Sequence, residues 1–198
     1  MSVQDKEKWD AKYLKKSQLL KPRDASANLK NALIHCSGKT ALDLACGAGR
    51  NSIYLARVGF SVDAIDIAQI AIDALDTEAT KQNLSSKINT KHVDLDTYVI
   101  EENRYDLIVM ANFLDRDVLK NAKKALNKDG ILFVETYMIN EENEKTSSDL
   151  SNLLVSQELK DIVGDSFDIL YYDEFKNEDY EIYKMQKQVI VAKKGDVA

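Results

Sequence analysis

The sequence predicts an α/β protein with a doubly wound, mostly parallel sheet. Short apolar segments of strand length alternate along the chain with longer segments that have helical periodicity. A glycine turn at residues 46–49 joins the first of these strands to a helix. Acidic or amide side chains follow several predicted strands, and open parallel sheets bind ligands at the carboxyl ends of their strands.

The composition is that of an ordinary globular protein. With 198 residues, 44% hydrophobic and 30% charged, we expect one domain, 1–198. A net charge of −6 argues against a large nonspecific nucleic-acid surface. Cys36 and Cys46 give neither a disulfide framework nor a metal-ligand cluster, so we expect no metal and a cytoplasmic location. No apolar run approaches the roughly 18 residues of a membrane span, and residues 1–5 lack a signal-peptide core.

The stretch Ala41–Ala56 organises the rest of the chain. It contains a predicted buried strand, a turn and a helix, at residues 41–45, 46–49 and 50–56. Glycine at positions 47 and 49 permits a tight turn and lets a ligand approach the backbone. The start of the helix offers unpaired N–H groups at its positive end. These features favour a nucleotide-like ligand.

The pattern within this stretch is Asp43-x-Ala45-x-Gly47-x-Gly49. A dinucleotide site has a third glycine or alanine, where this chain has Ser52. An acid before the turn would repel a pyrophosphate but would suit a ligand that carries an ammonium group and a sulfonium. A nicotinamide nucleotide and a turn without a ligand remain as alternatives.

The segments before this stretch are predicted to be helical. Residues 2–20 form a charged helix with Trp9 and Tyr13 one turn apart, and Pro22 marks a break before a second helix at 24–36. Two interpretations of the aromatic pair stay open. It packs the leading helix onto the core, or it covers the ligand.

The second strand, Ser61–Asp66, also ends in an acid. The helix that follows has one apolar face, made of Ile67, Ile70, Ala71, Ala74 and Leu75. Asp66 lies about 20 residues beyond Gly47, where a carboxylate can accept hydrogen bonds from both ribose hydroxyls.

The remaining strands continue this order. Lys87–Asp94 and Tyr105–Met110 are predicted strands, and the second of them is apolar enough to be covered on both faces. The elements expected after them are a helix at 114–126, a turn at 127–130, a strand at 131–137, a loop at 140–149, a helix at 156–163, and extended segments at 166–172, 180–185 and 188–192.

Several motifs together resemble the class I methyltransferases that use S-adenosylmethionine. In chain order they are DLACGAGRNS, VDAID, VDLD, YDLIVMANFLDR, LNKDGILFVETY and VIVAKK. The short chain and the GRNS–YLA continuation are similar to the tellurite-resistance and thiopurine-type small-molecule branch. The resemblance implies a seven-stranded Rossmann-like sheet with an antiparallel C-terminal strand, and a helical lid at about residues 1–37. Ala45 departs from the usual first glycine, and residues 128–130 depart from Pro-Gly-Gly.

The resemblance also implies contacts to S-adenosylmethionine. Asp66 would bind the ribose, Asp43 would lie near the methionine end, and Asp94 would accept from the adenine amine, with Leu95 beside the ring. For Asp94, a turn acid is the alternative. Further contacts are expected from Ala45, Gly47, Gly49, Arg50, Ile67 and Asn112.

The implied reaction is direct in-line displacement without a metal, which leaves S-adenosylhomocysteine as product. Asn112 and Tyr137 are expected to face the transferred methyl group, and Tyr13 to close the pocket. Glu135 would either join them or pair with Arg116. The expected acceptor is a small molecule, namely a thiol, a metalloid oxyanion or a small acid, with no nucleic-acid or membrane partner. The alternatives are a protein that binds S-adenosylmethionine without catalysis and a nicotinamide-dependent oxidoreductase. The sequence does not predict the oligomeric state.

Overall fold

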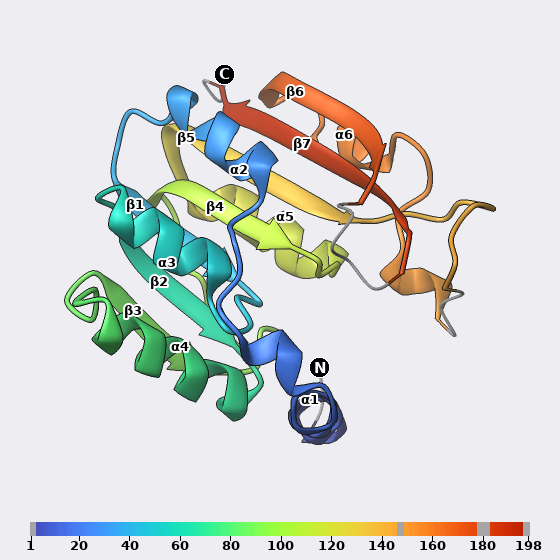
Figure 1. Cartoon of the computed structure of the whole chain (residues 1–198). Coiled ribbons are helices and arrows are strands. Elements are labelled where there is room, and N and C mark those ends of the chain that lie inside the picture. Colours follow the sequence, from blue (N-terminus) through green and yellow to red (C-terminus); the bar gives the residue numbers. More distant parts are fainter. Residues whose placement is uncertain (1–2, 146–148, 178–182, 196–198) are drawn as a thin grey trace.

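The computed structural model describes residues 3–145, 149–177 and 183–195, and the strands of this part form one sheet (Figure 1). In chain order they are β1 Thr40–Leu44, β2 Ser61–Asp66, β3 Ile88–His92, β4 Tyr105–Ala111, β5 Leu126–Tyr137, β6 Phe167–Lys176 and β7 Gln186–Lys194. Their order across the seven-stranded sheet is β3-β2-β1-β4-β5-β7-β6. Strands β1 to β5 pair in parallel, and β7 is antiparallel to both β5 and β6. The predicted fold class is confirmed.

Helices cover both faces of the sheet (Figure 1). The α-helices are α1 Val3–Lys15, α2 Ala27–Ala32, α3 Arg50–Arg57, α4 Gln69–Lys81, α5 Arg116–Ala125 and α6 Glu158–Val163. Short 3-10 helices are η1 Ser17–Leu20, η2 Leu33–His35 and η3 Leu150–Asn152. One apolar cluster joins the sheet to α2, α3 and α4, and a second joins its other face to α5 and α6.

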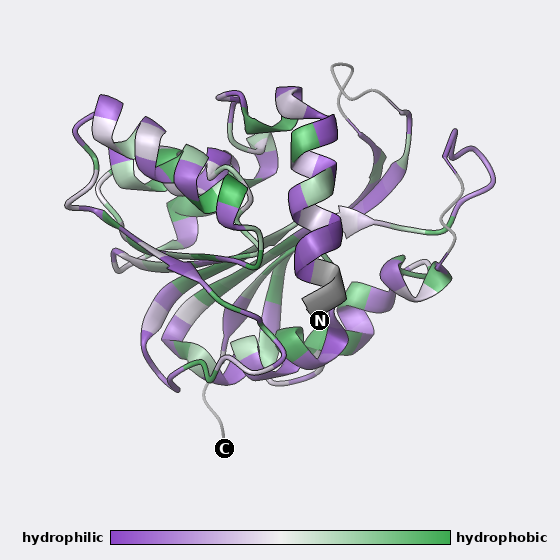
Figure 2. Cartoon of the chain, turned by 90° about the horizontal axis from the view of Figure 1, so that it is seen from below, coloured by the Kyte–Doolittle hydropathy of each residue, from purple (hydrophilic) through white to green (hydrophobic). Residues whose placement is uncertain are grey.

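The central strand β4 shows why the sheet needs both layers. Leu107 and Val109 belong to the cluster under α3, while Ile108 and Met110 belong to the cluster under α5. Successive side chains of a strand point to opposite faces, so an uninterrupted apolar run must be covered on both. Figure 2 shows this pattern as mostly hydrophobic strands in the middle of the molecule, with hydrophilic residues on the outer helix surfaces and loops.

The two predicted N-terminal helices are shorter in the structure. Residues 2–20 were expected to form one helix, but α1 ends at Lys15 and η1 follows it. The second helix begins at Ala27 and not at Asp24, because the Ser26 hydroxyl oxygen accepts the Leu29 N–H and caps α2. It passes into η2 after Ala32.

Two predictions near the C-terminal half also need correction. The expected turn at 127–130 lies inside β5, where a register shift between Tyr105 and Leu107 of β4 absorbs the extra residues. Of the extended segment expected at 180–185, residues 180–182 lie outside the described part, and β7 begins only at Gln186. The loop predicted at 140–149 has no helix or strand at 140–145, and residues 146–148 are not described.

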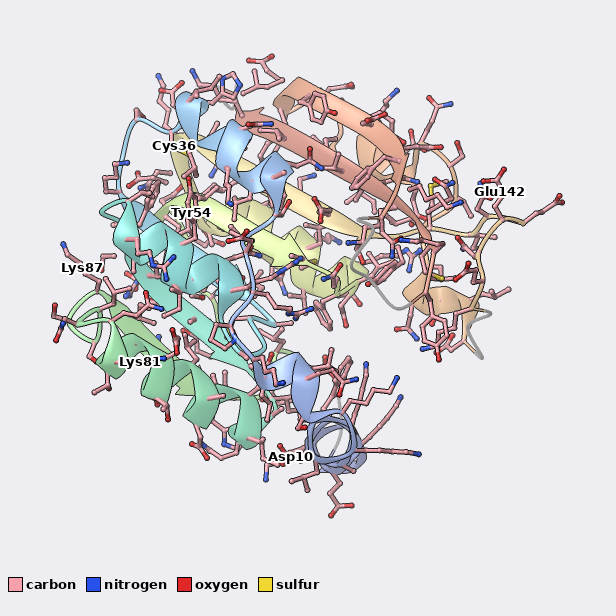
Figure 3. All side chains as sticks on the ribbon, in the orientation of Figure 1. Asp10, Cys36, Tyr54, Lys81, Lys87 and Glu142 are labelled. Atoms are coloured by element: carbon pink, nitrogen blue, oxygen red, sulfur yellow. The ribbon has the colours of Figure 1, made fainter. Side chains whose placement is uncertain are left out.

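Helix α1 packs against the start of α4, at the carboxyl end of the sheet (Figure 1). Tyr13 joins Ala68 and Ala71 in a small apolar cluster. Asp10, on the side of α1 that faces α4 in Figure 3, accepts the Ile70 N–H at 3.4 Å. Within the described residues, no helix is long and apolar enough to cross a membrane.

Candidate active site

A cavity of about 200 Å³ lies beyond the carboxyl ends of β1, β2, β4 and β5, and α1 contributes to its wall. Every site residue predicted from the sequence lines this cavity except Asp94 and Glu135. Those lining it are Tyr13, Asp43, Ala45, Gly47, Gly49, Arg50, Asp66, Ile67, Leu95, Asn112 and Tyr137. The fold therefore brings together residues that are far apart in the sequence.

The glycine turn has a left-handed backbone at three positions. Ala45, Gly47 and Gly49 have φ values of 54°, 55° and 77°. This explains why a glycine is usual at position 45, since a side chain is disfavoured there. A Cβ at Gly49 would lie 2.2 Å from the Leu75 side chain, so close packing requires that glycine. A Cβ at Gly47 would meet only the Tyr13 hydroxyl, at 2.9 Å, so Gly47 keeps the backbone open toward the cavity.

Asp43 is a carboxylate buried at the end of β1. It is 2% exposed, and its Oδ2 accepts the Ser52 hydroxyl at 2.6 Å. Burial raises the pKa of Asp43 to about 6, against the opposing effects of Ser52 and Arg50. Ser52 is thus the hydrogen-bond partner of this acid, which accounts for its presence where a dinucleotide site has glycine or alanine.

Asp66 holds two turns together at the end of β2. Its Oδ2 accepts the Gly47 N–H at 2.7 Å, and its Oδ1 accepts the Ala68 N–H at 2.8 Å. Burial raises the pKa of this carboxyl, while both hydrogen bonds oppose the shift. Each carboxylate oxygen can accept more than one hydrogen bond, so Asp66 keeps capacity for a pair of ligand hydroxyls.

The predicted adenine contacts divide into two groups. Ile67 and Leu95 are buried and line the cavity, where they offer apolar surface to a ring. Asp94 does not line it, and its Oδ1 accepts the Asp96 N–H at 3.0 Å. That contact matches the turn interpretation of Asp94, and its role at the adenine amine stays a prediction.

Asn112 and Tyr137, at the carboxyl ends of β4 and β5, form the wall of the cavity that we call the opposite wall. Asn112 has a left-handed backbone, φ 58°, and its N–H donates to the Glu135 carbonyl at 2.8 Å. Among the described residues, its buried Oδ1 has no hydrogen-bond partner. An unsatisfied buried acceptor is costly, which indicates a ligand donor at Asn112.

Tyr13 lines the cavity from α1. Its side chain is 9% exposed, and burial, followed by the charge of Asp66, raises the pKa of its phenol.

Both interpretations of Glu135 made from the sequence are wrong. Glu135 is fully buried and does not line the cavity, and Arg116 pairs instead with Glu158, with Nε 2.6 Å from Oε1. Glu135 accepts the Ser26 hydroxyl and pairs with Lys187.

Three cations that the sequence analysis missed also line the cavity: Lys12, Lys21 and Arg23. The Lys12 Nζ lies 3.7 Å from the ring centroid of Trp9. Burial, followed by the repulsion of neighbouring lysines, lowers the pKa of Lys12 to about 8. The only signal in the sequence was the density of lysine in the N-terminal segment, which is equally typical of a solvated helix.

Comparison with known proteins assigns the family. The family model described as tellurite resistance protein TehB matches residues 2–189. The chain belongs to the TehB family. It superposes on the crystal structure of TehB from Haemophilus influenzae with a TM-score of 0.75 and 28% identity, covering 86% of this chain and 62% of that one. A methyltransferase structure from Methanosarcina mazei gives a TM-score of 0.70 at 23% identity, covering 87% and 99% of the two chains.

The curated relatives of this TehB family member are methyltransferases. A probable S-adenosyl-L-methionine-dependent methyltransferase TehB of H. influenzae is 38% identical over 96 residues, which is 45% of this chain and 32% of the relative. A ubiquinone biosynthesis O-methyltransferase of Coxiella burnetii is 30% identical over 108 residues, 52% and 45% of the two chains. The chain thus spans less than half the length of these relatives. The predicted family and fold are confirmed, and the predicted cofactor is the one that its TehB relative is named for.

The cavity of this TehB family member fits S-adenosylmethionine chemically. The carboxylates of Asp43 and Asp66 suit its ammonium group and its ribose hydroxyls. Asn112 Oδ1 is a buried acceptor with no partner among the described residues. At Gly47 the absence of a side chain leaves room for a ligand against the backbone.

Proposed function

We propose that this chain transfers a methyl group from S-adenosylmethionine to a small acceptor that reacts in an anionic form. A thiolate, a metalloid oxyanion and a small carboxylate are the candidates. One observation carries the proposal: a single cavity is lined by two buried carboxylates, Asp43 and Asp66, and by four cations, Lys12, Lys21, Arg23 and Arg50. Acidic groups suit a cationic donor, and basic groups suit an anionic acceptor. The proposal treats the chain as one domain with residues 1–37 as its lid.

The chain's own residues would hold the donor at the ends of β1 and β2. Asp66 would accept hydrogen bonds from the ribose, and Asp43 would face the ammonium group. Ile67 and Leu95 would give apolar surface to the adenine ring. When bound, S-adenosylmethionine supplies an electrophilic methyl group on a positively charged sulfur.

The residues around the methyl acceptor would orient it and remove water from it. Lys12 and Arg23 would attract the anion, and Asn112 and Tyr137 would orient it. Tyr13 would exclude water, and its raised pKa keeps its hydroxyl protonated at neutral pH, so it is no general base. A thiolate or an oxyanion carries its own lone pairs and needs no such base. Positioning is thus the main contribution of the chain.

Incubation with methyl-labelled S-adenosylmethionine and a panel of thiols, metalloid oxyanions and small acids tests this proposal. We expect label transfer to one anionic class, with Lys12→Gln raising the KM for that acceptor about tenfold or more. Lys81→Gln removes an exposed lysine on the outer surface of α4 and is the matched control. Tight binding of the cofactor without transfer to any acceptor of the panel would favour a non-catalytic binding protein.

A further inference from the structure

Glu135 and Lys187 form a wholly buried ion pair that the proposed reaction does not use. Their side chains are both 0% exposed, with Nζ 3.5 Å from Oε1. They lie on the paired strands β5 and β7. Two residues away along each strand, Phe133 and Val189 belong to the apolar cluster under α2 and α3, so the ion pair points to that face. Burying two charges carries a desolvation penalty that needs further hydrogen bonds to offset it.

Those hydrogen bonds come from the N-terminal segment. The Ser26 hydroxyl donates to Glu135 Oε2 at 2.7 Å, and the Asn28 amide donates to the same oxygen at 3.1 Å. The Ser26 N–H donates to Asn51 Oδ1 at 3.3 Å. Ser26 and Asn28 lie at the start of α2, where the connection from α1 reaches the face of the sheet (Figure 1). The connection carries Arg23, which lines the cavity.

The same ion pair also contacts the cavity wall that Asn112 and Tyr137 form. Lys187 is opposite Tyr137 in the pairing of β5 and β7, and its Nζ lies 5.0 Å from the ring centroid of Tyr137. The carbonyl of Glu135 accepts the Asn112 N–H at 2.8 Å. One buried network therefore contacts the base of the N-terminal segment and both residues of the opposite wall.

We propose that the Glu135–Lys187 pair positions other residues of the site. We call it a latch, meaning a buried ion pair that keeps the N-terminal segment and the Tyr137 ring in place. Through Ser26 and Asn28 it holds residues 6–25 over the cavity, and through Lys187 it fixes the ring of Tyr137. Neither charged residue touches the reactants. The inference rests on the proposed function only for its effect on turnover, because the position of the N-terminal segment can be measured without any acceptor.

Hydrogen exchange of the backbone amides in residues 6–25, with and without S-adenosylhomocysteine, tests the latch. Glu135→Gln removes the charge, and Asn28→Asp sets a second carboxylate beside Glu135 at a half-buried position. We expect exchange in residues 6–25 to become about tenfold faster or more in both variants, the scale of a lost hydrogen bond to a charged group. Bound S-adenosylhomocysteine should protect these residues less than in the unsubstituted chain.

Asp63→Asn is the matched control, because it also removes a buried carboxylate. Asp63 is 8% exposed and accepts the Tyr105 hydroxyl at 2.7 Å, near the amino ends of the strands. We expect this variant to lose global stability in urea while exchange in residues 6–25 stays within about twofold of the unsubstituted chain. Unchanged exchange in both latch variants would overturn the proposal, as would equal acceleration in the control.

Turnover adds a second readout once an acceptor is identified. A latch predicts a raised acceptor KM and a lowered kcat in Glu135→Gln, with cofactor affinity within a few fold. Accelerated exchange together with an absence of transfer in the unsubstituted chain would support the latch and count only against the proposed function. Normal KM and kcat in a variant with normal exchange would refute the latch alone.

Discussion

Replacing Asp43 by asparagine should make the protein more stable and worse at binding its cofactor. Asp43 is fully buried, and the pKa of its carboxyl is about 6 in place of 3.8. That difference corresponds to roughly 3 kcal/mol by which the ionised carboxylate destabilises the fold above pH 6. Asparagine has nearly the same shape and can still accept the Ser52 hydroxyl. We therefore expect Asp43→Asn to raise the free energy of unfolding at pH 7.5 by about 1–3 kcal/mol.

The effect of Asp43 on the free energy of unfolding should depend on pH. Because the folded-state pKa of Asp43 lies above its unfolded value, the native protein binds more protons than the unfolded chain between about pH 4 and 6. Its stability should fall as the pH rises through that window and then level off. In Asp43→Asn this contribution to the slope disappears. Urea unfolding at half-unit steps from pH 4.5 to 8 measures both curves, with Asp63→Asn as the control.

Cofactor binding should respond in the opposite direction. A cationic ligand favours ionised Asp43, so calorimetry on the unsubstituted chain should show affinity for S-adenosylmethionine rising from about pH 5 to 7. Asp43→Asn should bind at least about tenfold more weakly at pH 7.5 and lack this rise. Unchanged affinity in Asp43→Asn would refute the assignment of Asp43 to the cationic end of the ligand. A variant that is less stable at pH 7.5 would refute the destabilising effect of the buried charge.

Three further predictions concern the same cavity. Asp66→Ala should weaken S-adenosylmethionine binding by about 1.5–3 kcal/mol in calorimetry, and it should also lower the free energy of unfolding, because the Gly47 N–H loses its acceptor. Gly47→Val should abolish cofactor binding and also lower thermal stability, since the branched side chain fills the approach to the turn and strains its left-handed backbone; a folded variant that binds normally would contradict this. Asn112→Ala and Tyr137→Phe should each lower methyl transfer about tenfold or more while calorimetry finds cofactor affinity within a few fold. Collapse of affinity with normal turnover would instead place these two residues in the cofactor site.

The sequence by itself determined the centre of this protein. The strand, turn and helix at residues 40–57 form from neighbouring residues, so glycine positions and apolar periodicity were enough to predict them. Asp43 and Asp66 follow from the same logic. Both end parallel strands, and the ends of parallel strands meet at one edge of a sheet. The cofactor and the antiparallel C-terminal strand were predicted instead from the resemblance of the motifs to the class I methyltransferases.

Only the tertiary structure decided what surrounds that centre. Ser26 and Glu135 are separated by 109 positions in the sequence, and no periodicity indicates that they share a hydrogen bond. Lys12 and Arg23 belong to a segment whose charges resemble those of any solvated helix, and they line the cavity only because α1 packs on α4 and the chain after it crosses the carboxyl end of the sheet. The physical reason is common to these cases. A side chain's surroundings depend on which face it presents and on what packs there, and local pattern leaves both open until the whole chain has folded.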